Sequence, residues 1–310
     1  MFEWLPDYDN ELANHYGYRR KAHKGPMKHG EVYSFYQANL ERRYGETTEH
    51  SYLQNWHDVT LERMVDWGFT SFGNWTDPMF YDNKKMPYFA NGWIIGEFKT
   101  LSSGFDIWGK MPDVFDPEFV RRANITTQVI AQEIKNSPWC VGIFIDNEQS
   151  WGGEGPPIRR YGIVFDALSK NAKESPSKAV FVKMLKQKYQ DIKALNNVWN
   201  KDITSWQQLS EGVNYKKEES YTDAMLVDLS WLLQTYADEY FKVVKNAIKE
   251  VLPNHMYMGA RFTTWGTAPE AVQAAKKYAD VVSYNYYREG LDEMTWGFLK
   301  ALDAPVIIGE

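Results

Sequence analysis

Cysteine and long apolar runs are nearly absent from this sequence. Its 310 residues include one cysteine, Cys140, which cannot form an internal disulfide and leaves the redox compartment open. Because it precedes an apolar stretch, we expect Cys140 to be a small buried core residue. No apolar run approaches the roughly 20 residues of a membrane-spanning helix, and the first residues lack the basic-then-apolar pattern of a signal peptide.

Blocks of basic residues are also missing. The sequence has 35 Lys and Arg against 41 Asp and Glu, a formal net charge of −6. Nucleic acids are bound by clustered basic side chains that neutralise phosphates, so this distribution argues against a nucleic-acid partner. A sulfated or uronic-acid polymer would also favour a basic groove. A neutral ligand fits the charge pattern better.

Aromatic residues, in contrast, are abundant. There are 13 Trp, 20 Tyr and 16 Phe, together 16% of the chain. Aromatic rings fill cores, and they also offer flat apolar faces with a polar handle at the edge. Sugar rings stack on such faces, so the excess favours a carbohydrate ligand.

Two apolar segments each lead into a glutamate. Residues 141–145 read as a strand buried on both faces and run into Asn147 and Glu148. Residues 305–308 are again apolar and lead through a glycine to Glu310. In a (β/α)8 barrel the active site lies at the carboxyl ends of the parallel strands, so we expect both glutamates at one rim.

Predicted strands alternate with predicted helices along the chain. The strongest helical periodicity is at 221–251, where apolar residues recur at steps of three or four. The predicted strands are 69–75, 92–98, 141–147, 256–262, 280–286 and 305–310. The predicted helices are 34–44, 56–67, 119–135, 221–251, 269–278 and 291–302, with a further helix and a short apolar set within 176–199.

This alternation predicts an α/β fold with a parallel sheet, because strand–helix–strand crossovers are right-handed. We predict a (β/α)8 TIM barrel that is incomplete, since six strands are counted where a closed barrel has eight. No linker, repeat or low-complexity tract divides the sequence. The whole of 1–310 is therefore expected to be one domain.

The two strand-end glutamates predict a glycoside hydrolase. Glycosidic bonds are cleaved by a pair of carboxylates, one acting as the acid and the other as nucleophile or base. We predict Glu148 and Glu310 as this pair. The amide of Asn147 can hydrogen-bond a sugar 2-hydroxyl, a contact that strengthens in the transition state. Tyr286 is expected to hydrogen-bond the Glu310 carboxylate.

Other side chains at or beyond the predicted strand ends are candidates for substrate binding. For Trp75, Trp151 and Trp265 the alternatives are stacking on sugar or packing at the rim, and Trp296 falls in or just before a helix. If Asp146 lies behind the rim, a structural hydrogen-bonding role is favoured. The full set of predicted substrate-binding residues is Asn74, Trp75, Asn147, Trp151, Arg261, Trp265, Asn285, Tyr286 and Trp296.

At these positions the sequence resembles glycoside hydrolase family 50, the β-agarases. The segments that carry the resemblance are FTSFGNWTDP at 69–78, PYFANGW at 87–93, FIDNEQSW at 144–151 and IIGE at 307–310. The resemblance implies a retaining barrel enzyme that hydrolyses β-1,4 linkages of agarose without metal or cofactor. It implies Glu148 as acid/base, Glu310 as nucleophile, and agarose or neoagaro-oligosaccharides as the bound ligands. It also implies a secreted, periplasmic or cell-surface protein.

The sequence departs from the family pattern at its ends, since a first and a last strand are missing from the predicted barrel. We therefore expect a fragment, truncated at both ends, that is inactive or poorly folded by itself. Two other functions stay open: a β-galactosidase of the same clan, and a non-catalytic polysaccharide-binding barrel. Retention of both strand-end glutamates counts against the second.

Overall fold

A computed structural model describes residues 4–21, 26–45, 51–153, 155–216 and 220–310. The side chains of Met294, Thr295, Trp296 and Phe298 lie outside this description. The chain divides into two compact units, Met1–Thr70 and Ser71–Glu310. The expectation that residues 1–310 form one domain remains a prediction.

The first unit combines a short hairpin with two helices. Strands β1 and β2 pair antiparallel, and the rings of Tyr16 and Tyr33 meet across them with centroids 4.8 Å apart. Ser34 caps α1 by accepting a hydrogen bond from Gln37 N. Both predicted helices are confirmed, although the second begins at Ser51 and not at residue 56. The elements are η1 (Glu11–His15), β1 (Tyr16–Arg19), β2 (Gly30–Tyr33), α1 (Phe35–Tyr44) and α2 (Ser51–Asp66).

Parallel strands form the middle of the second unit. The pairs β3–β6, β6–β7 and β8–β9 are all parallel. Single parallel bridges, Asn147 with Arg261 and Phe262 with Tyr284, continue the alignment from β6 past β7 to β8. The strands are β3 (Tyr88–Gly92), β6 (Cys140–Ile145), β7 (Met256–Tyr257), β8 (Val282–Tyr284) and β9 (Val306–Ile308). The fold is mixed α/β, and the described strands form small open sheets.

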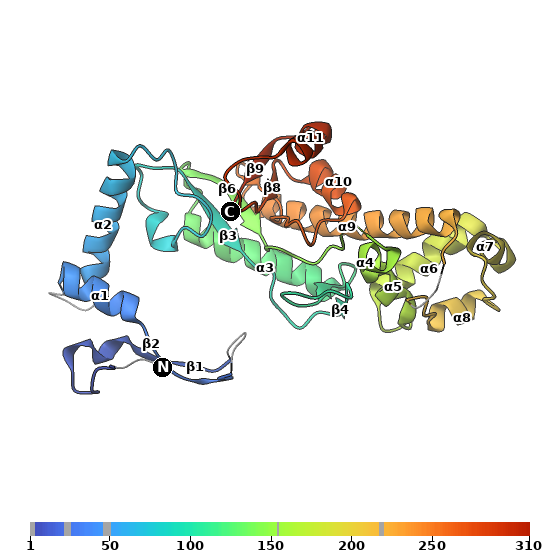
Figure 1. Cartoon of the computed structure of the whole chain (residues 1–310), viewed down its shortest axis with the longest axis horizontal. Helices are drawn as coiled ribbons and strands as arrows, with labels where there is room; N and C mark the ends of the chain where they lie inside the picture. Colours follow the sequence, from blue (N-terminus) through green and yellow to red (C-terminus); the bar gives the residue numbers. More distant parts are fainter. Residues whose placement is uncertain (1–3, 22–25, 46–50, 154, 217–219) are drawn as a thin grey trace. The chain divides into compact units, whose positions relative to one another are not determined.

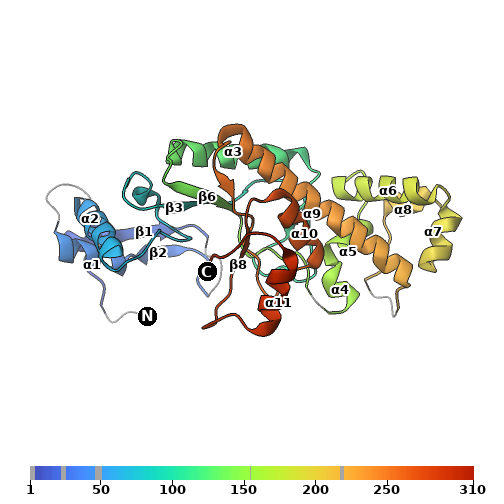
Figure 2. The same cartoon turned by 90° about the horizontal axis from the view of Figure 1, so that it is seen from above.

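Three helices pack along these strands, as Figures 1 and 2 show. They are α3 (Pro117–Ile134), α9 (Asp223–Val251) and α10 (Pro269–Tyr278). Asp116 caps α3 and Pro117 occupies its first position, two residues before the predicted start at 119. The apolar stripe of α9 is buried, which confirms it as a core face. None of the helices in the described ranges is long and apolar enough to cross a membrane.

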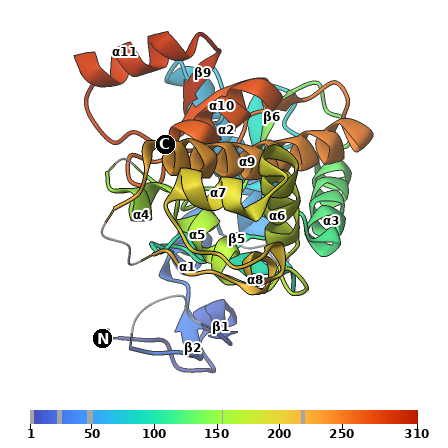
Figure 3. The same cartoon turned by 90° about the vertical axis from the view of Figure 1, so that its right-hand side faces the viewer.

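A group of short helices packs against the first half of α9 (Figures 1 and 3). Asp228 of α9 is fully buried there and accepts hydrogen bonds from Lys188 Nζ at 2.5 Å and Trp199 Nε1 at 2.7 Å. The sequence predicted α6 as a helix and the α7 segment only as a short apolar set, and it did not predict α4, α5 or α8. These helices are α4 (Pro157–Arg160), α5 (Gly162–Ser169), α6 (Pro176–Tyr189), α7 (Ile192–Trp199) and α8 (Trp206–Glu211).

The remaining elements of the second unit are short or peripheral. They are η2 (Pro78–Phe80), the antiparallel pair β4 (Thr100–Leu101) and β5 (Met111–Pro112), and α11 (Glu293–Leu302). Cys140 is 5% exposed at the start of β6, which confirms it as a core residue. Phe89, Phe144 and Met258 form a buried cluster between the strands.

Two predicted strands are wrong. Residues 69–75 contain no strand; Gly73 lies within the segment and Trp75 has a positive φ of 62°, which a strand does not tolerate. The strand predicted at 92–98 lies at Tyr88–Gly92 and stops where that prediction begins. At Gly92 a Cβ would come within 2.5 Å of Ile130 Cδ1, so the glycine permits close packing of α3 on β3. Of the predicted strand at 256–262, only β7 forms a ladder, because Gly259 turns the chain at φ 74°.

Candidate active site

Glu148 stands two residues beyond a turn of the chain at the end of β6. Asp146 and Glu148 both have positive φ, 61° and 49°, a conformation that costs energy for a residue with a side chain. The backbone N–H of Glu148 donates to Arg261 O at 3.0 Å. Its carboxylate accepts from Asn285 Nδ2 at 2.9 Å on Oε1 and from Trp108 Nε1 at 3.0 Å on Oε2. The side chain is thus held from two sides.

Glu310 follows β9 and is surrounded by three donors. Its Oε1 accepts from Asn74 Nδ2 at 2.8 Å and from Trp75 Nε1 at 2.6 Å. Its Oε2 accepts from the hydroxyl of Tyr287, and this hydrogen bond raises the pKa of Tyr287 to about 12. Tyr286 contributes its backbone N–H, which donates to Glu310 O at 2.8 Å.

Arg261 connects the polar contacts around Glu148 with those around Glu310. Its Nε donates to Asn147 Oδ1 at 2.8 Å and lies 3.5 Å from Glu310 Oε1. Asn285 Nδ2 reaches the same Asn147 oxygen at 3.2 Å and also binds Glu148. Glu148 and Glu310 are therefore brought together in one polar network at the carboxyl ends of parallel strands.

The Arg261 guanidinium is almost fully enclosed. It is 1% exposed and lies between the rings of Trp75 and Phe144, 4.7 and 4.6 Å from their centroids. Nη1 donates to Asn91 Oδ1 at 3.1 Å. Burial lowers the pKa of Arg261 to about 10, while Glu310 and Glu148 oppose that shift, so the group stays charged at neutral pH.

Asp146 lies behind the rim, as expected for a structural role. It is 6% exposed, its Oδ2 accepts from Tyr240 OH at 2.6 Å, and its Oδ1 accepts from Ile94 N at 2.9 Å. Burial raises the pKa of Asp146 to about 6. These contacts tie α9 and the residues after β3 to the end of β6, directly before Asn147 and Glu148.

A pocket of about 380 Å³ opens beside Glu148. Its lining includes residues 146–150 and also Trp93, Trp108 and Met111. Trp93 and Trp108 are 46% and 52% exposed. Trp93 also stacks on Trp75, with centroids 4.9 Å apart and planes inclined by 22°. Among the described residues, no group of three or more His, Cys, Asp and Glu could hold a metal ion.

Three predicted substrate-binding residues need correction. Trp151 is 0% exposed and packs on Tyr240 and Phe241, so it offers no face to a ligand. Arg261 is too enclosed to contact a substrate directly. The Tyr286 hydroxyl donates to Asp292 Oδ2 at 3.1 Å, and Tyr287 takes the place predicted for it on Glu310.

The other predicted residues lie in different surroundings. Asn74, Trp75, Asn147 and Asn285 are in the network around the glutamates. Trp265 is partly buried and lines a separate small cavity with Phe105 and Arg159. Trp296 lies in α11, but its side chain is outside the described residues.

Sequence reasoning missed Trp93, Trp108, Asn91 and Tyr287. Trp93 and Asn91 belong to a segment that carried the family resemblance, so they could have been found there. Trp108 lies in a loop rich in Gly and Ser, where no strand end pointed to it. Its contact with Glu148 arises only from tertiary folding.

No family model matches the chain. Similar proteins and solved structures were found, and they are named as β-agarases or GH50 proteins. It is 46% identical over 312 residues to Beta-agarase B of Vibrio sp. (strain JT0107), covering 100% of the chain and 32% of that protein. An exo-β-agarase structure matches 100% of the chain and 42% of its own at 58% identity, with a TM-score of 0.97. The structure of PfGH50B matches 99% of the chain and 43% of its own at 56% identity, with a TM-score of 0.92.

The chain therefore spans about a third of the length of the curated relative. The matched parts extend over both compact units and include the segments that end in Glu148 and Glu310, because nearly the whole chain is aligned in each case. Over its full length the chain is a homologue of one part of the glycoside hydrolase family 50 β-agarases.

Proposed function

We propose that the protein containing this chain is a β-agarase that hydrolyses β-1,4-galactosidic linkages of agarose with retention of configuration. Glu148 is the acid/base and Glu310 the nucleophile. The observation that supports this best is the network in which Asn147, Arg261 and Asn285 connect the two strand-end carboxylates. The similarity to β-agarases supports the choice of substrate.

The proposed reaction has two steps. Glu310 attacks the anomeric carbon C1 of galactose, the bond from C1 to the glycosidic oxygen breaks, and Glu148 gives its proton to that oxygen. A galactosyl ester of Glu310 results. Glu148, now ionised, then takes a proton from water, whose oxygen attacks C1 and releases Glu310 as a carboxylate.

The surroundings of each carboxylate suit these roles. Asn74, Trp75 and Tyr287 donate to Glu310, and such donors stabilise a negative charge and fix its direction of attack. Glu148 has the neutral donors Asn285 and Trp108 and borders the pocket, where a departing sugar can be accommodated.

The substrate is a neutral galactan, agarose or its oligosaccharides. Trp75 is 45% exposed and contributes an exposed ring edge on the Glu310 side, because Trp93 and Arg261 lie over its ring. Asn147 contacts the 2-hydroxyl, and Trp265 contacts a sugar unit further from the cleaved linkage.

The parallel strands β3, β6, β7, β8 and β9 are proposed to be consecutive parts of one (β/α)8 barrel, with 1–310 as part of a single catalytic domain. Because the chain spans about a third of Beta-agarase B, we expect the 310-residue polypeptide alone to show little turnover of agarose. A polymer such as agarose is met outside the cell. We therefore place the protein in the periplasm, at the cell surface or in the medium, which fractionation would test.

The proposal is tested by Glu148→Gln and Glu310→Gln in the full-length protein that contains this chain. Both variants are expected to lose roughly 10⁴-fold or more of kcat/KM on neoagarotetraose, as essential carboxylates do. On β-neoagarobiosyl fluoride, which needs no acid, the Glu148 variant should still form the glycosyl ester. Azide should then give a β-glycosyl azide with that variant and an α-glycosyl azide with the Glu310 variant.

Identical azide products from both variants would contradict the assignment of roles. Inverted configuration in the first product of the wild-type protein, followed by NMR, would contradict the retaining mechanism. Faster release from aryl β-galactosides than from neoagarotetraose would favour a β-galactosidase.

A further inference from the structure

The turn that carries Glu148 is held in a conformation that its own residues disfavour. Asp146 and Glu148 have φ values of 61° and 49°, a region that residues with a Cβ rarely adopt. Such residues keep this conformation only where the surrounding structure holds them in place. The turn therefore depends on contacts that come from outside residues 146–148.

Asp146 anchors this turn from inside the protein. Its backbone N–H donates to Gly92 O at 2.8 Å, and its Oδ1 accepts from Ile94 N at 2.9 Å. Its Oδ2 accepts from Tyr240 OH at 2.6 Å and from Gln149 Nε2 at 3.3 Å. Contacts from the end of β3, from the residue after Glu148 and from α9 thus meet at one buried side chain.

Tyr240 of α9 is the Asp146 partner whose position is fixed by the core. It is fully buried, and its ring packs on Trp151 and Phe119, whose ring centroids lie 4.9 and 5.7 Å away. Burial raises the pKa of the Tyr240 hydroxyl well above its usual value, so it remains a donor at neutral pH. Because α9 is a long helix with a buried face, this hydroxyl is a rigid reference point for the carboxylate.

We propose that Tyr240 and Asp146 act as a positioning pair for the acid/base. The Tyr240 hydroxyl fixes the Asp146 carboxylate, and that carboxylate fixes the turn on which Glu148 stands. This inference rests on the proposed function, in which Glu148 protonates the glycosidic oxygen. A general acid has to lie within hydrogen-bonding reach of that oxygen, and a displacement of about 1 Å can cost roughly 10²-fold in rate. Both residues of the pair are buried and act through Glu148.

The pair serves the acid and not the nucleophile. Glu310, after β9, is held by a different set of side-chain donors, namely Asn74, Trp75 and Tyr287. Loss of the Tyr240 hydroxyl should therefore disturb proton donation and leave the attack of Glu310 on C1 nearly unchanged. Substrates whose leaving group needs no proton separate the two effects.

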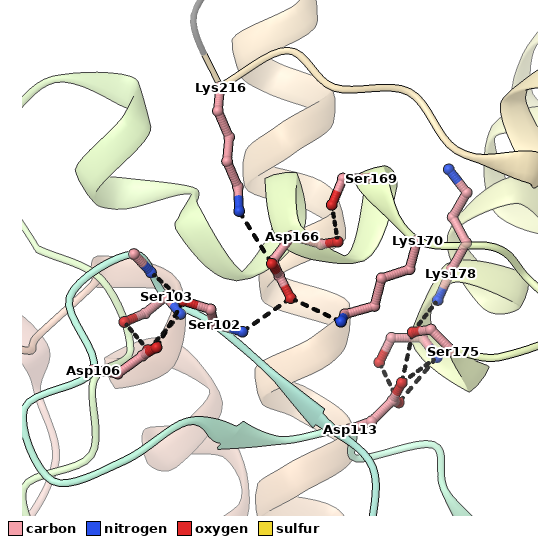
Figure 4. A network of polar contacts seen from close by, with 12 residues as sticks. Ser102, Ser103, Asp106, Asp113, Asp166, Ser169, Lys170, Ser175, Lys178 and Lys216 are labelled. Carbon is pink, nitrogen blue, oxygen red and sulfur yellow. Dashed lines mark hydrogen bonds and ion pairs between the residues drawn. The ribbon is translucent and has the colours of Figure 1, made fainter.

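Tyr236 provides a matched control one turn earlier on α9. It is also fully buried, and its hydroxyl donates to Pro112 O at 2.6 Å. The next residue, Asp113, is held separately by Ser175 Oγ at 2.7 Å, as Figure 4 shows. Tyr236→Phe therefore removes an equivalent hydroxyl from the same helix and leaves the contacts of Asp146 in place.

The test varies the leaving group while the galactosyl side stays constant, in the full-length protein. Aryl β-neoagarobiosides whose phenols have higher pKa values need more help from an acid, whereas dinitrophenolate and fluoride leave without it. The quantity measured is the slope of log kcat/KM against the pKa of the phenol. Each value is divided by kcat/KM for β-neoagarobiosyl fluoride in the same preparation, so the fraction of folded protein cancels.

Tyr240→Phe is expected to steepen this slope. With unsubstituted phenol as the leaving group, and with neoagarotetraose, kcat/KM should fall roughly 10- to 100-fold, the effect of a displaced acid. With dinitrophenolate or fluoride the change should stay within about threefold. Tyr236→Phe should keep the wild-type slope, even if its melting temperature falls.

Substitutions of Asp146 test whether Tyr240 acts through it. Asp146→Asn keeps an oxygen that can accept from Ile94 N and an amide that can donate to the Tyr240 hydroxyl, so it should lose less activity than Asp146→Ala. If the two side chains act as one unit, Tyr240→Phe combined with Asp146→Ala should be no slower than Asp146→Ala alone. Additive losses would overturn the pairing.

Equal losses of kcat/KM across all leaving groups in Tyr240→Phe, or unchanged activity, would overturn the proposal. An equal steepening in Tyr236→Phe would also overturn it, because the effect would then come from the packing of α9 in general. Glu148→Gln separates this outcome from the proposed function. If that variant leaves the slope unchanged, the acid/base assignment itself is wrong. If it steepens the slope and Tyr240→Phe does not, only the positioning pair is wrong.

Discussion

The two carboxylates of the site differ in what surrounds them. Glu310 accepts three side-chain hydrogen bonds, from Asn74, Trp75 and Tyr287, and has the Arg261 guanidinium 3.5 Å away. Glu148 accepts two, from neutral donors, and borders an open pocket. One carboxylate is held by several donors beside a cation, and the other has fewer donors and borders a pocket. Such contrast between two acids is how one site can separate a nucleophile from an acid.

Substitution of Arg261 should have the largest effect on this difference, because Arg261 lies beside Glu310 and also hydrogen-bonds Asn147 next to Glu148. Arg261→Lys keeps a positive charge but loses the planar fork that reaches Asn147 and Asn91 together. We expect kcat/KM to fall roughly 10²- to 10³-fold, the cost of disturbing a buried, hydrogen-bonded charge. Both neoagarotetraose and β-neoagarobiosyl fluoride should be affected, since the Glu310 side is needed for either.

Arg261→Met removes the charge as well and should lose more activity than the lysine variant. If the lysine variant retained full activity, Arg261 would be a packing residue between Trp75 and Phe144 and nothing else. A loss of kcat/KM on neoagarotetraose alone would show that Arg261 acts only through the Glu148 side of the site.

Much of this contrast could be predicted from the sequence, and some could not. The strand ends at Glu148 and Glu310 were visible because apolar runs lead directly into them. Asn147 and Asn285 follow the same rule. The strand-end rule failed at Asn74 and Trp75, which reach Glu310 from a segment that is not a strand. Both side chains lie in the network around Glu310 although no strand end leads to them.

Side-chain direction was the main source of error. Trp151 follows the strand end closely, but the chain turns at Asp146 and Glu148, and the indole points into the core against α9. Tyr286 and Tyr287 are neighbours whose hydroxyls reach different carboxylates, Asp292 and Glu310. A one-residue difference of this kind depends on backbone dihedrals and cannot be read from composition or period.

Asp146, which anchors the chain two residues before Glu148, can be tested through the pH dependence of protein stability. Burial raises its pKa in the folded protein to about 6, from an ordinary value of 3.8. The folded state therefore holds this proton more tightly than the unfolded state does. Its contribution to stability is complete below about pH 4 and is lost as the pH rises through about 6.

Asp146→Asn removes this titration while its amide oxygen can still accept from Ile94 N. Relative to wild type, the variant should gain about 3 kcal/mol of unfolding free energy between pH 4 and pH 7, an order-of-magnitude figure from the pKa shift. The other groups that face Asp146, namely Tyr240, Tyr257 and Arg261, are common to both proteins. Melting temperatures of the wild type and Asp146→Asn across this pH range measure the difference in stability. A difference that does not change with pH would contradict the raised pKa of Asp146.

The finest test of the Glu310 side is the pair Tyr287→Phe and Tyr286→Phe. Tyr287 donates to Glu310, and with a pKa of about 12 it remains a donor throughout the working range. Its removal takes one hydrogen bond from a charged group and should cost roughly 10- to 100-fold in kcat/KM on both substrates. Tyr286→Phe deletes a hydroxyl bound to Asp292, so activity should stay within about twofold. A larger loss in Tyr286→Phe than in Tyr287→Phe would show that Tyr286 hydrogen-bonds Glu310, as the sequence alone predicted. The two tyrosine rings would then have to exchange places in the active protein.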